Sequence, residues 1–173
     1  LGGGTGMIAF EFKGGIGTAS RVLKPDQGGY TLGVLVQANF GLRHQLRIAG
    51  LPMGQELRDD MIYSRAETAA PGAAQSGSII IVVATHAPLL PHQLERLARR
   101  AAMGLARTGS VAGNGSGDLF LPFSTANPGA LNRKDVATLL MFPNDRMGPL
   151  FEATVGATEE AIVNAMVAAR TMV

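Results

Sequence analysis

The chain has no cysteine, and only three of its 173 residues are histidine. Without cysteine it can form neither disulfide bonds nor reactive thiols. The histidines have no cysteine or carboxylate companions at the spacing of a zinc site, so the sequence predicts no metal and no other cofactor. These histidines are His44, His86 and His92.

A large charge of one sign is also missing. The formal net charge is only +2, and the Lys and Arg residues are spread along the chain. Nucleic acid and anionic membrane are therefore not expected partners.

The longest apolar run, residues 79–84, is far shorter than the roughly 20 residues of a membrane-spanning helix. The apolar fraction of 46% is that of an ordinary soluble domain. Its compartment, cytoplasmic or periplasmic, stays open.

The start of the chain lacks an initiator Met, and Val173 falls where a helical pattern is running out. We therefore interpret the chain as part of a longer protein, whose targeting signals are not visible. The glycine-rich run at residues 2–6 looks superficially like a phosphate cradle. It lacks the Gly-Lys-Ser/Thr ending of a P-loop, and a strand rather than a helix follows it, so nucleotide binding is not expected.

Apolar alternation and Gly or Pro turn signals predict most of the secondary structure. The expected strands are 7–13, 17–23, 30–38, 78–85 and 119–124, with the first two joined by a hairpin turn at Gly14-Gly15. One expected helix begins near Pro91 and has Gly109 as its C-terminal cap. Two further expected helices cover 133–140 and 148 to about 170. Long helices after nearly continuous apolar strands imply a layered α+β or α/β sandwich.

Residues 67–77 consist mainly of Ala, Gly, Pro, Ser and Gln, which is typical of a linker. The strand 78–85 follows directly, so Gly77-Ser78 separates a flexible segment from a rigid one. The Ser78 hydroxyl could attack the Gly77 carbonyl in an N-to-O acyl shift, and hydrolysis of the ester would leave Ser78 as a new N-terminus. Alternatively, Ser78 could merely begin a strand, which is the interpretation that the spacing alone favours.

An N-terminal serine would carry both nucleophile and base, because an α-amine has an ordinary pKa of about 7.7 to 8.0 and lies within reach of its own hydroxyl. Asn39 closes an apolar strand, where its amide could donate to a developing oxyanion or simply begin a turn. Ser116 and Asp118, in the glycine-punctuated loop 114–118, could form a hydroxyl backed by a carboxylate or a plain tight turn. The loop is not the Gly-x-Ser-x-Gly elbow of α/β-hydrolases.

Taken together, these segments resemble the autoprocessing L-aminopeptidase/D-esterase family of DmpA type, which includes the β-peptidyl aminopeptidases. The likeness extends over essentially the whole chain. Its most specific parts are the glycine run at the start, the strand that ends in Asn39, the Gly77-Ser78 junction and the Ser116 loop. The segments that carry the resemblance are 2–7, 12–21, 36–41, 77–85, 97–101 and 114–118.

The resemblance implies an α+β fold, a four-layer αββα sandwich similar to N-terminal-nucleophile hydrolases. Residues 1–173 would be one incomplete domain of that kind, lacking the family's preceding segment. The family cuts itself before its nucleophilic serine. Residues 1–77 would accordingly end an α-chain, and residues 78–173 would begin a β-chain.

The resemblance also assigns roles. Ser78 would be the nucleophile and Asn39 the oxyanion-hole residue, with Ser116 and Asp118 in support, where some members have Glu in place of Asp. Members release N-terminal residues from short peptides, amides or esters through an acyl-enzyme, need no metal, and usually assemble as homotetramers of α/β heterodimers. Whether L, D or β residues are preferred stays open.

Two alternatives accompany this interpretation. An ornithine-acetyltransferase-like acyltransferase has a similar fold, but its nucleophile is threonine where this chain has Ser78. The chain could also be an inactive, unprocessed fragment, because part of the sheet is expected to lie outside it.

Overall fold

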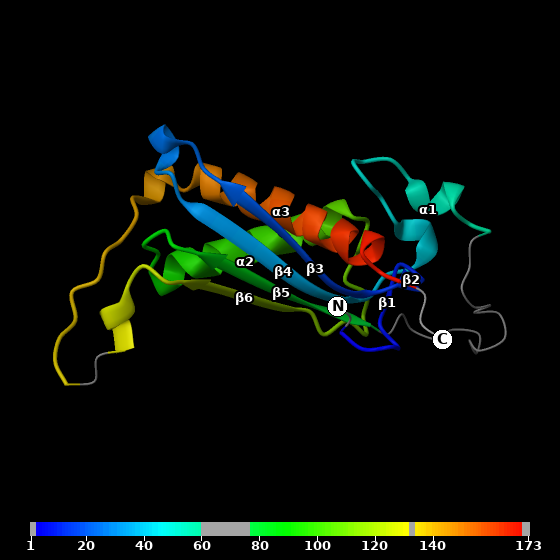
Figure 1. Ribbon diagram of the computed structural model, residues 1–173, viewed down its shortest axis with the longest axis horizontal. Helices are drawn as coiled ribbons and strands as arrows, with labels where there is room; N and C mark the ends of the chain where they lie inside the picture. The colour runs from blue at the N-terminus through cyan, green and yellow to red at the C-terminus, as the bar shows by residue number, and fades with distance from the viewer. Residues whose placement is uncertain (1–2, 60–76, 132–133, 171–173) are drawn as a thin grey trace.

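The computed structural model describes residues 3–59, 77–131 and 134–170, and its centre is a four-stranded sheet (Figure 1). The strands lie in the order β3-β4-β5-β6. β3–β4 and β4–β5 are antiparallel, whereas β5–β6 is parallel. Because parallel neighbours need a crossover, helix α2 connects β5 to β6. The bounds are β3 Gly15–Val22, β4 Thr31–Asn39, β5 Ser78–Thr85 and β6 Leu119–Ser124.

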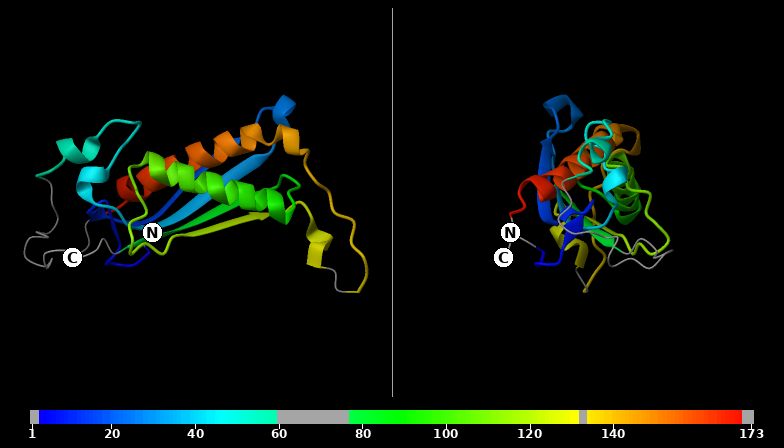
Figure 2. Two further views of the ribbon diagram at one scale, coloured as in Figure 1. Left: turned by 180° about the vertical axis from the view of Figure 1, so that it is seen from behind. Right: turned by 90° about the vertical axis from the view of Figure 1, so that its right-hand side faces the viewer.

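Helices α2 (Pro91–Arg107) and α3 (Gly148–Val167) cover the same face of the sheet. They lie behind it in Figure 1 and in front of it in the left view of Figure 2. Two glycines allow close packing here. A Cβ at Gly17 would lie 2.0 Å from the Ala161 carbonyl oxygen of α3, and one at Gly104 would lie 2.6 Å from Thr158 Cβ. A larger residue at Gly17 would push α3 away from the sheet, and one at Gly104 would push the two helices apart.

The core lies between the sheet and the helices. Alternate residues of β4 and β5 point toward the helices, because successive side chains of a strand face opposite ways. The buried apolar residues include Leu32, Val34, Val36, Ile79, Ile81, Val83, Leu97, Ala101, Leu105, Leu150, Ala157 and Ala161. This burial is the main stabilising contribution to the fold.

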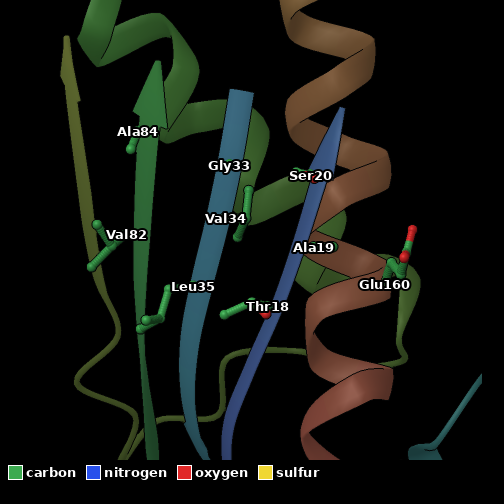
Figure 3. A pocket seen from close by; sticks show the side chains of 9 residues that line it. All are labelled: Thr18, Ala19, Ser20, Gly33, Val34, Leu35, Val82, Ala84 and Glu160. Carbon is green, nitrogen blue, oxygen red and sulfur yellow. The ribbon is translucent and has the colours of Figure 1, made fainter. Parts of the chain in front are cut away.

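The opposite face of the sheet carries no helix of the described residues, and it is partly apolar. The β6 side chains Leu119, Leu121 and Phe123 are 53%, 51% and 46% exposed. Residues of β3, β4 and β5, together with Glu160 of α3, line an open hollow on this face (Figure 3). We refer to this side of the sheet as the uncovered face.

The sequence prediction was wrong for residues 7–13. They form two short antiparallel strands, β1 (Ile8–Ala9) and β2 (Phe12–Lys13), which turn at Phe10 and Glu11. The hairpin expected at Gly14-Gly15 is absent, because β3 begins at Gly15 and pairs with β4. The Phe10 ring is fully buried and contacts Phe40 at 4.9 Å between centroids, so tertiary packing fixes this turn.

The helix expected over 133–140 is also wrong, since residues 134–140 are not helical. The Asn127 side chain donates to the Leu140 carbonyl oxygen and accepts from its N–H, so it takes backbone groups that a helix would use. Val136 is 94% exposed, which leaves this segment without a buried face.

The other expected elements are confirmed. Strands 78–85 and 119–124 have the expected bounds, and the third strand is shifted by one residue. α2 begins at Pro91, and Gly109 follows its end with φ 97°. The linker expected at 67–77 lies outside the described residues except for Gly77.

The remaining elements of the described ranges are short. They are η1 Pro25–Gln27, η2 Arg43–Gln45, α1 Met53–Glu56, η4 Pro128–Leu131 and η5 Asn144–Arg146. No helix in these ranges is long and apolar enough to cross a bilayer.

Candidate active site

Asn39 and Ser78 are directly paired at one end of the sheet. β4 ends at Asn39 and β5 begins at Ser78, and the antiparallel register places the two residues opposite each other. Directly opposed residues of such a pair point to the same face, with Cβ atoms about 4.5–5.5 Å apart. Both side chains are half-buried. Asn39 and Ser78 are therefore neighbours, although 38 residues separate them in the sequence.

The loop before β6 brings a backbone donor to Ser78. The Gly117 N–H donates to Ser78 Oγ at 3.0 Å. A Cβ at Gly117 would lie 3.3 Å from that oxygen, so a side chain here would crowd the hydroxyl. The loop reaches this position because β6 runs parallel to β5 and begins beside its first residues, with Leu119 paired to Ile80.

Asp118 connects this loop to β5. Its Oδ1 accepts a 2.6 Å hydrogen bond from Ser116 Oγ and a 3.1 Å hydrogen bond from the Ile79 N–H. The carboxylate therefore holds the Ser116 hydroxyl and the second residue of β5 together. A hydrogen bond to a charged carboxylate is stronger than one between neutral groups, so this arrangement keeps the loop beside Ser78.

The Asn39 amide is held in one orientation. Its Oδ1 accepts a hydrogen bond from the Ile8 N–H of β1 at 3.0 Å. A backbone N–H can only donate, so the oxygen branch must face Ile8 and the NH₂ branch must lie on the other side. Among the described residues, Nδ2 has no acceptor. Asn39 thus presents two N–H donors at the end of β4, next to Ser78.

Gly77 precedes Ser78 in a conformation that favours glycine, with φ 151°. A Cβ at this position would lie 2.5 Å from the Asn39 carbonyl oxygen and 3.1 Å from Phe40 Cα. Any other residue would have to move away from the end of β4. The peptide bond before Ser78 is accordingly held close to the Asn39 backbone.

A pocket borders the loop on the helix side. It is formed by α2, the segment after α2, the Ser116 loop and β6. Its lining residues are Ala102, Leu105, Ala106, Ser110, Val111, Ala112, Ser116, Asp118 and Phe120. Within the described ranges, no group of three or more His, Asp or Glu side chains could hold a metal ion.

The structure thus brings Ser78, Asn39, Ser116 and Asp118 to one end of the sheet. The sequence analysis did not find the backbone N–H groups that contact them, which belong to Gly117, Ile8 and Ile79. Gly117 lies in the loop 114–118, for which the sequence prediction considered only the side chains of Ser116 and Asp118. No sequence signal identified Ile8, because its contact depends on the unexpected turn at Phe10 and Glu11.

Comparison with known proteins gives the family. The model for peptidase family S58 matches residues 1–173. The chain belongs to peptidase family S58. The S58 chain is 50% identical to the beta-peptidyl aminopeptidase BapA of Sphingosinicella microcystinivorans, over 99% of this chain and 45% of that protein. It therefore spans less than half the length of this curated relative.

Solved structures confirm the fold. The S58 chain matches the L-aminopeptidase D-Ala-esterase/amidase of Ochrobactrum anthropi, described as a prototype for the serine aminopeptidases and as a new variant of the Ntn hydrolase fold, with a TM-score of 0.84 and 47% identity. That match covers 98% of this chain and 44% of the other. A Burkholderia sp. beta-aminopeptidase matches with a TM-score of 0.78 and 51% identity, over 95% and 44%. The mixed sheet and its two helices are thus an α+β structure of the Ntn hydrolase type.

Proposed function

We propose that the protein is a serine aminopeptidase that cuts its own chain between Gly77 and Ser78 and then uses Ser78 as an N-terminal nucleophile. The observation that carries this proposal is the hydrogen bond from the Gly117 N–H to Ser78 Oγ, 3.0 Å long, with Asn39 directly opposite. This donor stabilises negative charge on the oxygen as its proton leaves. Membership of a peptidase family supports the reaction class.

Self-cleavage begins with attack of Ser78 Oγ on the Gly77 carbonyl carbon. A C–O bond forms, the Gly77–Ser78 C–N bond breaks, and the hydroxyl proton passes to the departing nitrogen. The product is an ester with a free Ser78 amine, and water then hydrolyses the ester and restores the hydroxyl. Glycine at this position supports the step, because a residue without a Cβ adopts φ 151° beside the Asn39 carbonyl oxygen and leaves the peptide free to move toward the hydroxyl.

In turnover, the freed α-amine of Ser78 accepts the proton of its own hydroxyl, and Oγ attacks the substrate carbonyl. The Asn39 NH₂ group donates to the developing oxyanion. The Ser116–Asp118 pair holds the loop that supplies the Gly117 N–H. The leaving amine takes a proton as the C–N bond breaks, and water then hydrolyses the acyl-enzyme.

The substrates we propose are short peptides, amino-acid amides and esters that are cleaved after their N-terminal residue. The relatives named above are aminopeptidases, which supports this class. We also propose a homotetramer of cleaved α/β heterodimers. The uncovered face supports a larger sandwich, because partly exposed apolar side chains such as Leu121 would be buried by a second sheet.

The experiment that tests this function is analysis of the mature, intact protein by denaturing gel and N-terminal sequencing. We expect two polypeptides, one of which begins Ser78-Ile79-Ile80. The same preparation should release p-nitroaniline from small amino-acid p-nitroanilides. A single uncut polypeptide with full activity would contradict the proposal, and acetyl transfer from an N-acetyl donor to glutamate would favour the acyltransferase alternative.

A further inference from the structure

The turn between β1 and β2 is strained. Phe10 and Glu11 occupy its two central positions with φ 49° and 61°. A two-residue turn with two positive φ angles is normally built from Asn and Gly, because other residues are crowded there. Each such residue costs on the order of 1–3 kcal/mol and persists only when its surroundings hold it in place.

Arg43, which is only 4% exposed, holds this turn. Its Nε donates to the Phe10 carbonyl oxygen at 3.0 Å, and its Nη2 donates to the Glu11 carbonyl oxygen at 2.7 Å. Its backbone N–H donates to Glu11 Oε2 at 2.9 Å. The guanidinium carbon lies 3.3 Å from the centroid of the Phe12 ring. A planar guanidinium can make both side-chain hydrogen bonds and stack on the Phe12 ring at once, whereas a lysine cannot.

The clamped turn adjoins the candidate active site. Phe10 donates its N–H to the Phe40 carbonyl oxygen at 2.8 Å, one residue after Asn39. Ile8, two residues before Phe10, donates to Asn39 Oδ1. The orientation of the Asn39 amide therefore depends on the position of β1, and the position of β1 depends on the turn that Arg43 holds.

We infer that Arg43 is a positioning residue, which holds the strained turn so that the Ile8 N–H fixes the Asn39 amide with its NH₂ branch available to the oxyanion. This inference rests on the proposed function, in which Asn39 donates to the oxyanion. In this proposal Arg43 and Glu11 act on the reaction through Ile8 and Asn39.

A double-mutant cycle in the intact protein tests the inference. The variants are Arg43→Lys, Asn39→Ala and the two combined, and the readouts are kcat and KM for a p-nitroanilide and the rate of self-cleavage. We expect Asn39→Ala to lower kcat about 10²- to 10³-fold. Arg43→Lys should lower kcat roughly 10- to 100-fold with KM nearly unchanged, because only part of the donor's effect is lost. The double variant should match Asn39→Ala, because the effects of coupled residues are not additive.

Two controls separate positioning from stability. Arg47→Lys changes a neighbouring arginine whose side chain donates to the Gly50 carbonyl oxygen, and it should leave kcat unchanged. Leu150→Ala removes a buried side chain of α3, and it should lower the thermal midpoint without lowering kcat of the folded protein.

The outcomes distinguish the positioning role of Arg43 from the oxyanion role of Asn39. If Arg43→Lys and Asn39→Ala have additive effects on log kcat, or if Arg43→Lys has none, the positioning role is overturned while the role of Asn39 stands. If Asn39→Ala leaves kcat unchanged, the oxyanion role itself fails. Should Arg43→Lys not fold, Glu11→Ala replaces it in the cycle. Glu11→Gly should then retain more activity than Glu11→Ala, because both variants lose the Glu11 carboxylate but only glycine adopts the positive φ without strain.

Discussion

The two ends of β5 each carry a hydroxyl residue, and the two hydroxyls are bonded differently. Thr85 is 4% exposed; its Oγ1 donates to the Thr31 carbonyl oxygen at 2.7 Å and accepts from the Ala87 N–H at 3.1 Å. Ser78 is half-buried, and its Oγ accepts from the Gly117 N–H. Within the described part of the chain, the Ser78 proton has no acceptor.

This difference shows how a structural hydroxyl can be distinguished from a potentially reactive one. Thr85 uses both its donor and its acceptor to satisfy backbone groups, so its proton is committed to the fold. Ser78 has a donor on its oxygen and an uncommitted proton, which is available to a base such as the α-amine that the proposed self-cleavage would free. Substitutions at the two ends of the strand should therefore separate activity from stability.

The largest effect is expected for Ser78→Ala. Loss of the nucleophile should abolish self-cleavage and lower kcat on the order of 10⁶-fold. The free energy of unfolding should change little, because within the described ranges the side chain takes part in one hydrogen bond. A denaturing gel, a p-nitroanilide assay and urea unfolding provide the three readouts. Two polypeptides in this variant would rule out Ser78 as the residue that cuts the chain.

The second-largest effect on kcat is expected for Asn39→Asp. Aspartate keeps an oxygen that can accept from the Ile8 N–H, but it removes the NH₂ donor. We expect kcat to fall at least about 10²-fold, while the thermal midpoint stays close to that of the parent protein. Steady-state kinetics and thermal unfolding check this. Unchanged kcat with a lowered midpoint would make Asn39 a structural residue, like Thr85.

A smaller effect is expected for Gly77→Ala. The added Cβ would meet the Asn39 carbonyl oxygen at 2.5 Å, so the peptide before Ser78 must shift. A misplacement of about 1 Å can slow a reaction roughly 10²-fold, and we expect that slowing in self-cleavage, followed as the loss of the uncut band with time. Gly33→Ala is the matched control, because a Cβ at Gly33 has no atom within 4 Å. Equal cleavage rates in the two variants would contradict the expectation.

The smallest effect on activity is expected for Thr85→Val, at the other end of the strand. This change removes the hydrogen bonds to Thr31 and Ala87 and should cost about 1–3 kcal/mol of unfolding free energy. The kcat of the folded variant should stay near that of the parent. Thr85→Ser keeps the hydroxyl and should lose less stability. A large loss of kcat in folded Thr85→Val would contradict the distinction between a structural hydroxyl at Thr85 and a reactive one at Ser78.

The regular part of the fold could be predicted because its signals are local. β5 and β6 are apolar runs between turn residues, and α2 has a periodic apolar face that begins at Pro91. The turn at Phe10 and Glu11 could not be predicted, because neither residue favours positive φ and the contacts that hold them come from Arg43. Local propensity was overridden there by tertiary contacts.

The candidate site was only partly accessible from the sequence. Spacing alone favoured a strand start for Ser78 and a tight turn for Ser116 and Asp118, and the assignment of catalytic roles came from a family resemblance. That Asp118 accepts from the Ile79 N–H follows from the parallel pairing of β5 and β6, which the sequence analysis did not specify.

The position of β5 has a consequence for how the protein could be produced. β5 lies between β4 and β6 and is hydrogen-bonded to both, so a break before its first residue would free a terminus without freeing the strand. Two separately encoded polypeptides, one ending at Gly77 and one starting at Ser78, should therefore assemble during co-expression without a covalent link. The hydrogen-bonded ladder, rather than the peptide bond, would then keep the two halves together.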